Sequence, residues 1–213
     1  AWKLGFSLMV KALEGGGGIG IHVIDSMKEL TPIIQRTRQV ATSAFVSLSL
    51  FFERYLKDAS HIEVQLIGDH HGNLVHLYER DCSVQRRIQI LVEETPSTAK
   101  LTPRLRRRVC SLATKLGNFI GYTSTGTVEF LVSADGSVFF LEMNARLQVE
   151  HGVTEMVTGL DLVELQLRVA AGEKLPITQD EVSVNGHAIE VRVYPEDPET
   201  FMPDAGDITG LHQ

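Results

Sequence analysis

The stretch 127–151, TVEFLVSADGSVFFLEMNARLQVEH, most constrains how this chain can fold. Apolar residues alternate on both sides of Asp135 and Gly136. An Asp-Gly pair favours a two-residue hairpin turn, because both central positions of that turn need positive φ. With this pair at the centre, the pairing predicts that Glu129 lies directly opposite Glu142.

The two glutamates share one face of the predicted hairpin with Asn144, while Val128, Phe130 and Val132 point to the other face and into a core. Like charges facing each other across strands are destabilising, so we expect a cation between them. Two carboxylates and an amide oxygen are hard ligands that suit Mg²⁺ or Mn²⁺ holding phosphates. A solvated hairpin face with two unrelated glutamates is the alternative, since Glu is most often exposed.

Arg146, Gln148 and Glu150 follow the second strand at alternate positions. In an extended segment these three side chains lie on one face, next to the expected metal. An arginine is well shaped to hold a planar oxyanion and a nearby glutamate can take a proton, which indicates a site for a small carboxylate or carbonate. An ordinary surface Arg-Glu pair is the alternative.

Composition restricts the class of protein. The chain has 213 residues, enough for one domain or two small ones, and its net charge of -7 argues against a general nucleic-acid binder. No apolar run reaches membrane-spanning length and no signal peptide is visible, so we expect no membrane partner. Two cysteines, Cys82 and Cys110, lack metal-type spacing and suit a reducing compartment.

Periodicity and turn residues predict the elements of an α+β protein. Clean alternation at 61–67 predicts a half-buried strand with His61, Glu63 and Gln65 on its polar face. Further strands are expected at 7–12, 21–25, 74–78 and 187–193, and helices at 26–40, at 102–116 with Gly117 as the stop, and at 161–172.

A glycine run at 15–20 lies between the first two predicted strands. Such a run lets backbone N–H groups approach and cradle phosphates, but a flexible hairpin explains it about as well. His61, His70 and His71 invite a metal interpretation, yet one strand residue and a turn pair are more often solvated.

Three motifs together resemble a known family. They are FLEMNARLQVEHGVTEMVTG from Phe140, YERDCSVQRR at 78–87 and KALEGGGGIG at 11–20. They are similar to the biotin carboxylase component of biotin-dependent carboxylases, most of all the acyl-CoA carboxylase type. The resemblance implies an α+β ATP-grasp fold, with a small lid subdomain at 1–55 and a larger antiparallel-sheet subdomain at 56–213 with flanking helices. It also implies that the chain is an internal fragment.

The resemblance also implies a set of site residues. For ATP these are Lys11, Gly17, Gly18, Glu53, Arg54, Leu56, His61 and Gln85. For Mg²⁺ or Mn²⁺ they are Glu129, Glu142 and Asn144. For bicarbonate and biotin they are Arg146, Gln148, Val149 and Arg192.

The implied reaction is the ATP- and bicarbonate-dependent carboxylation of biotin through carboxyphosphate. Glu150 would deprotonate bicarbonate, and the adjacent Arg146 would keep its carboxylate ionised. Arg192 would stabilise the enolate of biotin. The implied partners are a biotinyl carrier domain, a carboxyltransferase subunit and a second copy or larger complex, in the bacterial cytoplasm or the mitochondrial matrix.

The sequence departs from the family pattern where an anion would bind. The family usually has His-Gln-Lys where this chain has Ile88, Gln89 and Ile90. Ile19 stands where the family carries Arg or Lys, and His22 stands where an Arg is usual. Because these changes remove positive charge around an anionic substrate, we expect an impaired anion site. A non-catalytic, nucleotide-binding or structural carboxylase-like subunit is therefore the alternative function.

Overall fold

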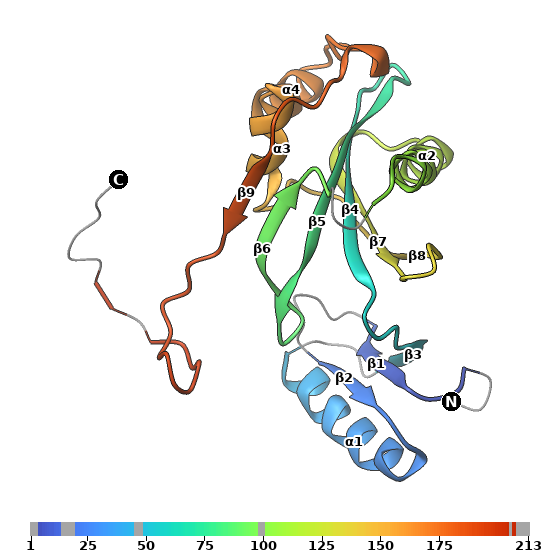
Figure 1. Cartoon of the computed structure of the whole chain (residues 1–213), viewed down its shortest axis with the longest axis vertical. Helices are drawn as coiled ribbons and strands as arrows, with labels where there is room; N and C mark the ends of the chain where they lie inside the picture. Colours follow the sequence, from blue (N-terminus) through green and yellow to red (C-terminus); the bar gives the residue numbers. More distant parts are fainter. Residues whose placement is uncertain (1–3, 14–19, 45–48, 98–100, 205, 208–213) are drawn as a thin grey trace.

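The structure, a computed structural model, describes residues 4–13, 20–44, 49–97, 101–204 and 206–207. Two antiparallel sheets, one of three strands and one of six, organise these residues (Figure 1). In Figure 1 the smaller sheet and its helix lie below the larger sheet. None of the helices in these ranges is long and apolar enough to cross a membrane.

The three-stranded sheet has the order β2-β1-β3, with β1 at Leu8–Ala12, β2 at Ile21–Ile24 and β3 at Leu50–Arg54. The helix α1, Met27–Ala44, packs on it, and Leu8, Val10 and Ile24 form its buried core. The first two strands were predicted. The helix runs one turn further than the capping pattern indicated, and its Glu29 carboxylate accepts a hydrogen bond from the backbone N–H of Asp25.

The six-stranded sheet has the order β8-β7-β4-β5-β6-β9. Its strands are β4 at Ser60–Gly68, β5 at Leu74–Arg86, β6 at Gln89–Thr95, β7 at Ser124–Val132, β8 at Val138–Asn144 and β9 at Ala188–Val191. The pairing of β4 with β7 is non-local, and it sets Glu63 opposite Glu129. Polar residues from distant parts of the sequence therefore meet on one face of the sheet.

Helices cover both faces of the large sheet, as Figure 1 shows. They are α2 at Pro103–Phe119, α3 at His151–Thr158 and α4 at Leu162–Ala170, with a short 3₁₀ turn at Gln179–Glu181. One core contains Ile62, Val64 and Leu66 of β4 with residues of α2, and a second core contains residues of α4. Because β4 is buried on both faces, the prediction of a half-buried strand was wrong: its polar face lies inside the protein.

The β7–β8 hairpin keeps the predicted pairing of Glu129 with Glu142, but by a different route. Its loop is one residue longer than a two-residue turn, because Ser133 N–H donates to the Ser137 carbonyl across three residues, of which Gly136 has φ +80°. Val132 therefore pairs with Val138. Between Phe130 and Glu129 the register shifts by one residue, because Leu141 is an extra residue on β8. This shift restores the predicted pairing of Glu129 with Glu142.

Helix α2 continues past Gly117, which the sequence suggested as its stop. A Cβ at this position would lie 2.7 Å from Cδ2 of Leu74, so the glycine allows the helix to approach β5 closely. The predicted N-cap is confirmed, since the Thr102 hydroxyl accepts from the Leu105 N–H. In α4 the Asp161 side chain caps the helix as predicted, by accepting from the Glu164 N–H.

Candidate active site

The three expected metal ligands lie together at the end of the β7–β8 hairpin. Asn144 Nδ2 lies 2.5 Å from Oε1 of Glu129 and 3.4 Å from Oε1 of Glu142. Glu129 is 5% exposed whereas Glu142 is exposed, so the group reaches from the interior to the surface. Cross-strand pairing, rather than proximity in sequence, produces this group of two carboxylates and one amide.

His61 and Gln85, both expected at a nucleotide site, join this group through Glu129. Nε2 of His61 lies 2.7 Å from Oε2 of Glu129, and the Gln85 amide nitrogen lies 2.7 Å from Nδ1 of His61. Burial lowers the pKa of His61, but the hydrogen bond to Glu129 and the nearby carboxylates outweigh burial and raise it overall. The histidine therefore connects the expected nucleotide residues to the expected metal residues.

A buried arginine that the sequence analysis did not single out lies beneath these residues. Arg80 on β5 is 0% exposed, and its guanidinium donates to Oε2 of Glu63 at 3.1 Å and to Oε1 of Gln65 at 2.7 Å. It also donates to the hydroxyls of Thr127 and Thr154. These contacts come from β4, β7 and α3, all distant from Arg80 in sequence, so no local pattern in the sequence marked this arginine as central.

Gln148 ties this arginine to the metal group. Its Oε1 accepts from Arg80 at 2.9 Å and its Nε2 donates to Oε1 of Glu129 at 3.0 Å. Since the two ends of the amide have different partners, the side chain has one orientation. The residue assigned to bicarbonate by resemblance is therefore buried and already held on both sides.

Glu63 is the least satisfied member of this network. Its Oε2 accepts from Arg80, but Oε1 has no hydrogen-bond partner among the described residues. Burial raises the pKa of Glu63 to about 7, in spite of the opposing charge of Arg80. A buried carboxylate oxygen without a hydrogen bond lowers the stability of the fold, so Glu63 has a destabilising position in this network.

Glu150 forms an ion pair with Arg192, not with Arg146. Nη2 of Arg192 lies 2.9 Å from Oε2 of Glu150, and its Nε lies 2.6 Å from Oε1 of Glu93. The extended segment expected after Asn144 is absent, because β8 ends there and Glu150 is the N-cap of α3. Glu93, which is fully buried, was missed by the sequence analysis.

Arg146 and Val149 lie on the outside of the same loop. The Arg146 side chain is exposed and donates to the carbonyl of its neighbour Leu147 at 3.2 Å. Val149 is 64% exposed. The single face expected for residues 146, 148 and 150 is therefore divided, with Gln148 and Glu150 inside and Arg146 outside.

The expected nucleotide residues of the small sheet are grouped in part. Lys11 on β1 and Glu53 on β3 form an ion pair of 2.5 Å. Arg54 is the exposed last residue of β3, and the partly buried Leu56 follows it. The lid glycines Gly17 and Gly18, with Ile19, lie outside the described residues.

Comparison with known proteins places this architecture in a family. Residues 1–178 match the family described as carbamoyl-phosphate synthase L chain, ATP binding domain. The chain belongs to this family. The chain is 49% identical over 211 residues to biotin carboxylase 2 of Bacillus subtilis, and the match covers 99% of the chain and 47% of that protein. It is 48% identical over 212 residues to the mitochondrial methylcrotonoyl-CoA carboxylase subunit alpha of Rattus norvegicus, covering 99% of the chain and 30% of the relative.

Solved structures confirm the ATP-grasp fold of this ATP-binding domain. The biotin carboxylase domain of 2-oxoglutarate carboxylase from Hydrogenobacter thermophilus superposes with a TM-score of 0.92 at 46% identity, covering 95% of the chain and 45% of that chain. That structure is a dimer in complex with MgADP, ADP and bicarbonate. A biotin carboxylase from Campylobacter jejuni superposes with a TM-score of 0.91. The chain spans less than half the length of these relatives.

The turn between β5 and β6 carries Ile88, at which the sequence predicted a departure from the family pattern. Arg86 pairs with Gln89, and the two central residues, Arg87 and Ile88, have φ of +53° and +66°. Positive φ at both positions defines a turn that favours Asn and Gly, so the β-branched Ile88 is strained there. It is 42% exposed, and Ile90 is partly buried on β6.

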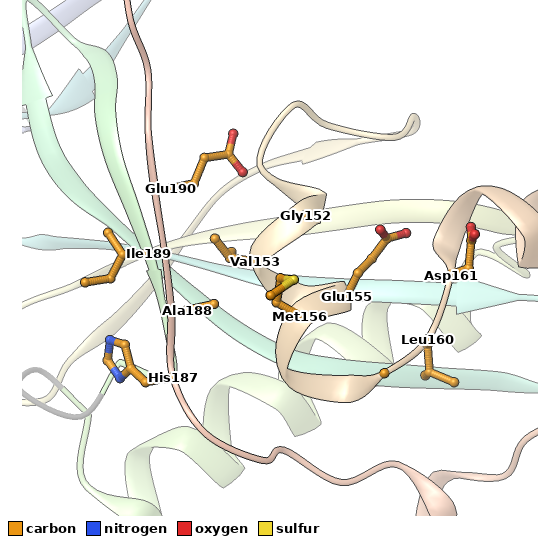
Figure 2. Close-up of a pocket in the computed structure, with 11 residues that line it drawn as sticks. Gly152, Val153, Glu155, Met156, Leu160, Asp161, His187, Ala188, Ile189 and Glu190 are labelled. Atoms are coloured by element: carbon orange, nitrogen blue, oxygen red, sulfur yellow. The ribbon is translucent and has the colours of Figure 1, made fainter. Parts of the chain in front are cut away.

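A separate hollow lies between α3 and β9. Its volume is about 820 Å³, and it is lined by Met156 of α3 and by Ile189 and Glu190 of β9, among others. Figure 2 shows that the lining residues come from these two elements, from the turn after α3 and from His187, which directly precedes β9. None of the expected site residues is among the residues that line it.

Proposed function

We propose that this chain is the ATP-grasp part of a biotin carboxylase, which carboxylates biotin with ATP and bicarbonate through carboxyphosphate. The observation that carries the proposal is the ion pair between the buried Glu150 and the partly buried Arg192, whose Oε2 and Nη2 lie 2.9 Å apart. It sets a candidate base against a fixed cation, in a chain whose relatives are named biotin carboxylases and carboxylase alpha subunits. The first half-reaction of an acyl-CoA carboxylase is the function in question.

The donor set on the hairpin fits the divalent metal that this function needs. Glu129, Glu142 and Asn144 offer two carboxylates and an amide oxygen, which are hard ligands typical of Mg²⁺ or Mn²⁺. The amide must turn over to present its oxygen in place of the nitrogen that now faces Glu129. When bound, the metal neutralises charge on the phosphates of ATP.

The nucleotide would lie between the small and large sheets. In the proposal the residues that hold it are Lys11, Gly17, Gly18, Glu53, Arg54, Leu56, His61 and Gln85. Residues 1–55 form the lid subdomain, and residues 56–213 supply the metal, bicarbonate and biotin sites. Lys11 would exchange its Glu53 partner for a phosphate oxygen, which changes one charge-assisted contact for another.

Glu150 is the proposed base for bicarbonate. It removes the bicarbonate proton, and the freed oxygen attacks the γ-phosphorus of ATP while ADP leaves. Carboxyphosphate then breaks into CO₂ and phosphate, and the phosphate takes the N1 proton of biotin. The guanidinium of Arg192 holds the Glu150 carboxylate in place by an ion pair and then stabilises the biotin enolate that attacks CO₂. Arg146, Gln148 and the backbone of Val149 would bind bicarbonate.

The names of the relatives support the proposed partners. They are a biotinyl carrier domain, a carboxyltransferase subunit and a second copy of the chain, since one relative is described as a dimer. The relatives include bacterial and mitochondrial proteins, so we propose the bacterial cytoplasm or the mitochondrial matrix as the location.

The test separates nucleotide binding from turnover. ATP with MgCl₂ is titrated into the chain by calorimetry, and ADP release is then followed with free biotin, with and without bicarbonate. We expect saturable ATP binding, and ADP release that depends on bicarbonate and is lost in Glu150→Gln. Bicarbonate-independent hydrolysis, or absence of ATP binding, would overturn the proposal.

A further inference from the structure

Three metal-binding side chains converge on the polar face of β4, below the hairpin group. One ligand atom each from His61, Glu63 and Glu129 lies within 4.8 Å of the others. Nε2 of His61 is 2.7 Å from Oε2 of Glu129 and 3.5 Å from Oε1 of Glu63. Their side chains are 12%, 0% and 6% exposed, so water competes little for these atoms.

The oxygen of Glu63 that faces this cluster is the one that lacks a partner. Oε1 is buried without a hydrogen bond among the described residues, whereas Oε2 is held by Arg80. Buried polar atoms are almost always satisfied, so an unpaired carboxylate oxygen aimed at an imidazole and a second carboxylate points to an absent cation.

The donor set identifies the kind of cation. Imidazole nitrogen is a ligand that suits Zn²⁺, and Zn²⁺ also accepts carboxylate oxygens, whereas Mg²⁺ prefers oxygen alone. Three such ligands would leave a fourth position open. Bonds of about 2.0–2.1 Å in a tetrahedral site place neighbouring ligand atoms about 3.3 Å apart. The separations of 2.7 Å and 3.5 Å from His61 Nε2 lie on either side of this value, and all three ligand atoms lie within 4.8 Å of one another.

The surroundings of His61 suit a ligand role. When Nε2 binds a metal, the ring proton is on Nδ1 and needs an acceptor, usually a carbonyl or carboxylate. The amide of Gln85 lies 2.7 Å from Nδ1 and offers a carbonyl oxygen once it turns over. Arg80 balances part of the negative charge of Glu63 without blocking Oε1.

We propose that His61, Glu63 and Glu129 form a binding site for a divalent ion of the Zn²⁺ type, distinct from the group of Glu129, Glu142 and Asn144. The two sites share Glu129, so an ion in one competes with an ion in the other. Binding of Zn²⁺ to the chain does not rest on the proposed function. Inhibition of ATP binding by Zn²⁺ through Glu129 rests on it.

The test measures Zn²⁺ binding to the nucleotide-free chain by equilibrium dialysis. We expect one bound ion per chain, and an affinity at least tenfold weaker in His61→Asn. Two matched controls should stay within twofold of the parent chain. His187→Asn removes an exposed His-Glu pair, whose Nε2 lies 3.3 Å from Oε2 of Glu94, and Glu142→Gln alters only the hairpin group.

Three results of the dialysis experiment would contradict the proposed Zn²⁺ site. Absence of binding, unchanged affinity in His61→Asn, or an equal loss in Glu142→Gln would overturn the proposed site. X-ray absorption of the Zn²⁺-loaded parent chain gives a second readout that needs no folded variant. One imidazole with oxygen ligands supports the site, and none or several imidazoles refute it. A chain that binds Zn²⁺ here but does not bind ATP keeps this site and rejects the proposed function.

Discussion

Arg192 lies with its guanidinium Nη2 2.9 Å from Oε2 of Glu150, although 42 residues separate the two in sequence. The contact exists because β9 pairs with β6 at the sheet edge while α3 begins next to it. Arg192, and not the neighbouring Arg146, is therefore the arginine that forms an ion pair with Glu150.

Glu150→Gln should therefore remove the proposed base while leaving its surroundings in place. Loss of general base catalysis costs about 10²–10⁴ in rate, so bicarbonate-dependent ADP release should fall by that factor. The affinity for ATP should stay within twofold, because Glu150 is not among the proposed nucleotide residues. Steady-state kinetics and calorimetry measure the two quantities. Equal losses in both would show that Glu150 has a structural role instead.

Arg80→Met should destabilise the fold strongly. Removing one partner of a buried ion pair leaves the other charge uncompensated, which costs about 3–5 kcal/mol. Glu63 is that partner, and both side chains are 0% exposed. Urea unfolding measures the loss, and the double variant with Glu63→Met should recover much of it. Arg168→Met, which removes exposed ion pairs, should give no resolvable change. A mild effect of Arg80→Met would refute the central role of this arginine.

Asp69 should make the fold sensitive to acid. Its carboxylate accepts from the N–H groups of His71, Asn73 and Leu175, and from the Asn73 side chain. Burial alone would raise the pKa of Asp69, but these hydrogen bonds outweigh it and hold the pKa below the ordinary value of 3.8. A carboxyl group whose pKa is lowered by folding adds to the free energy of unfolding at pH values above its ordinary pKa. This contribution is lost as the pH falls from the ordinary pKa towards the lower pKa of the folded state.

Asp69→Asn should therefore lower the free energy of unfolding by about 2 kcal/mol at pH 7, and by less as the pH approaches 3. Urea unfolding at several pH values gives the difference from the parent chain. Asp135→Asn, in an exposed turn, should show a smaller effect. A difference that does not change with pH would show that ionised Asp69 is not the source.

Ile88→Asn should stabilise the chain. Asn tolerates positive φ far better than a β-branched residue, so the change relieves about 1 kcal/mol of strain at φ +66°. The urea midpoint should rise with an unchanged slope. Ile90→Asn is the matched control on the adjoining strand, and it should lower the midpoint because it replaces a partly buried β-branched residue there. A fall of the midpoint in Ile88→Asn would contradict the strain argument.

The double change Ile88→His with Ile90→Lys tests whether cations at these two positions would strengthen the binding of ATP. A charge-assisted contact with a phosphate contributes about 1.5 kcal/mol, so the affinity for ATP should rise about tenfold. Calorimetry with ATP and MgCl₂ measures it. Ile88→Gln with Ile90→Gln adds polarity without charge and should not reproduce the gain. An unchanged affinity in the His/Lys variant would show that these positions do not face the nucleotide.

Local patterns in the sequence were sufficient for most elements and for one cross-strand pair. The alternation around the Asp-Gly pair predicted Glu129 opposite Glu142, and the caps at Thr102 and Asp161 were confirmed. The prediction of a two-residue turn was wrong, because the loop has three residues. The bulge at Leu141 restores the pairing of Glu129 with Glu142 in spite of this difference.

Contacts between distant elements could not be predicted in this way. Arg80 looked like one charge in a dense polar run, because nothing near it in sequence shows that α3 covers its strand. The ion pair of Arg192 with Glu150 depends on the edge pairing of β9. The expected pairing of Arg146 with Glu150 was wrong because adjacency in sequence was taken for adjacency in space.

The bulge at Leu141 separates the hairpin tip from the carboxylate pair. The extra residue Leu141 lies between the loop and Glu142. Residues 138–140, on the loop side of this bulge, can therefore shift their pairing by one position while Glu129 and Glu142 stay opposite each other on the same face. A one-residue insertion or deletion at 134–136 is therefore absorbed before it reaches the site. The tip of this hairpin is a suitable attachment point for a fluorescent label that reports on ligands without displacing the residues that bind them.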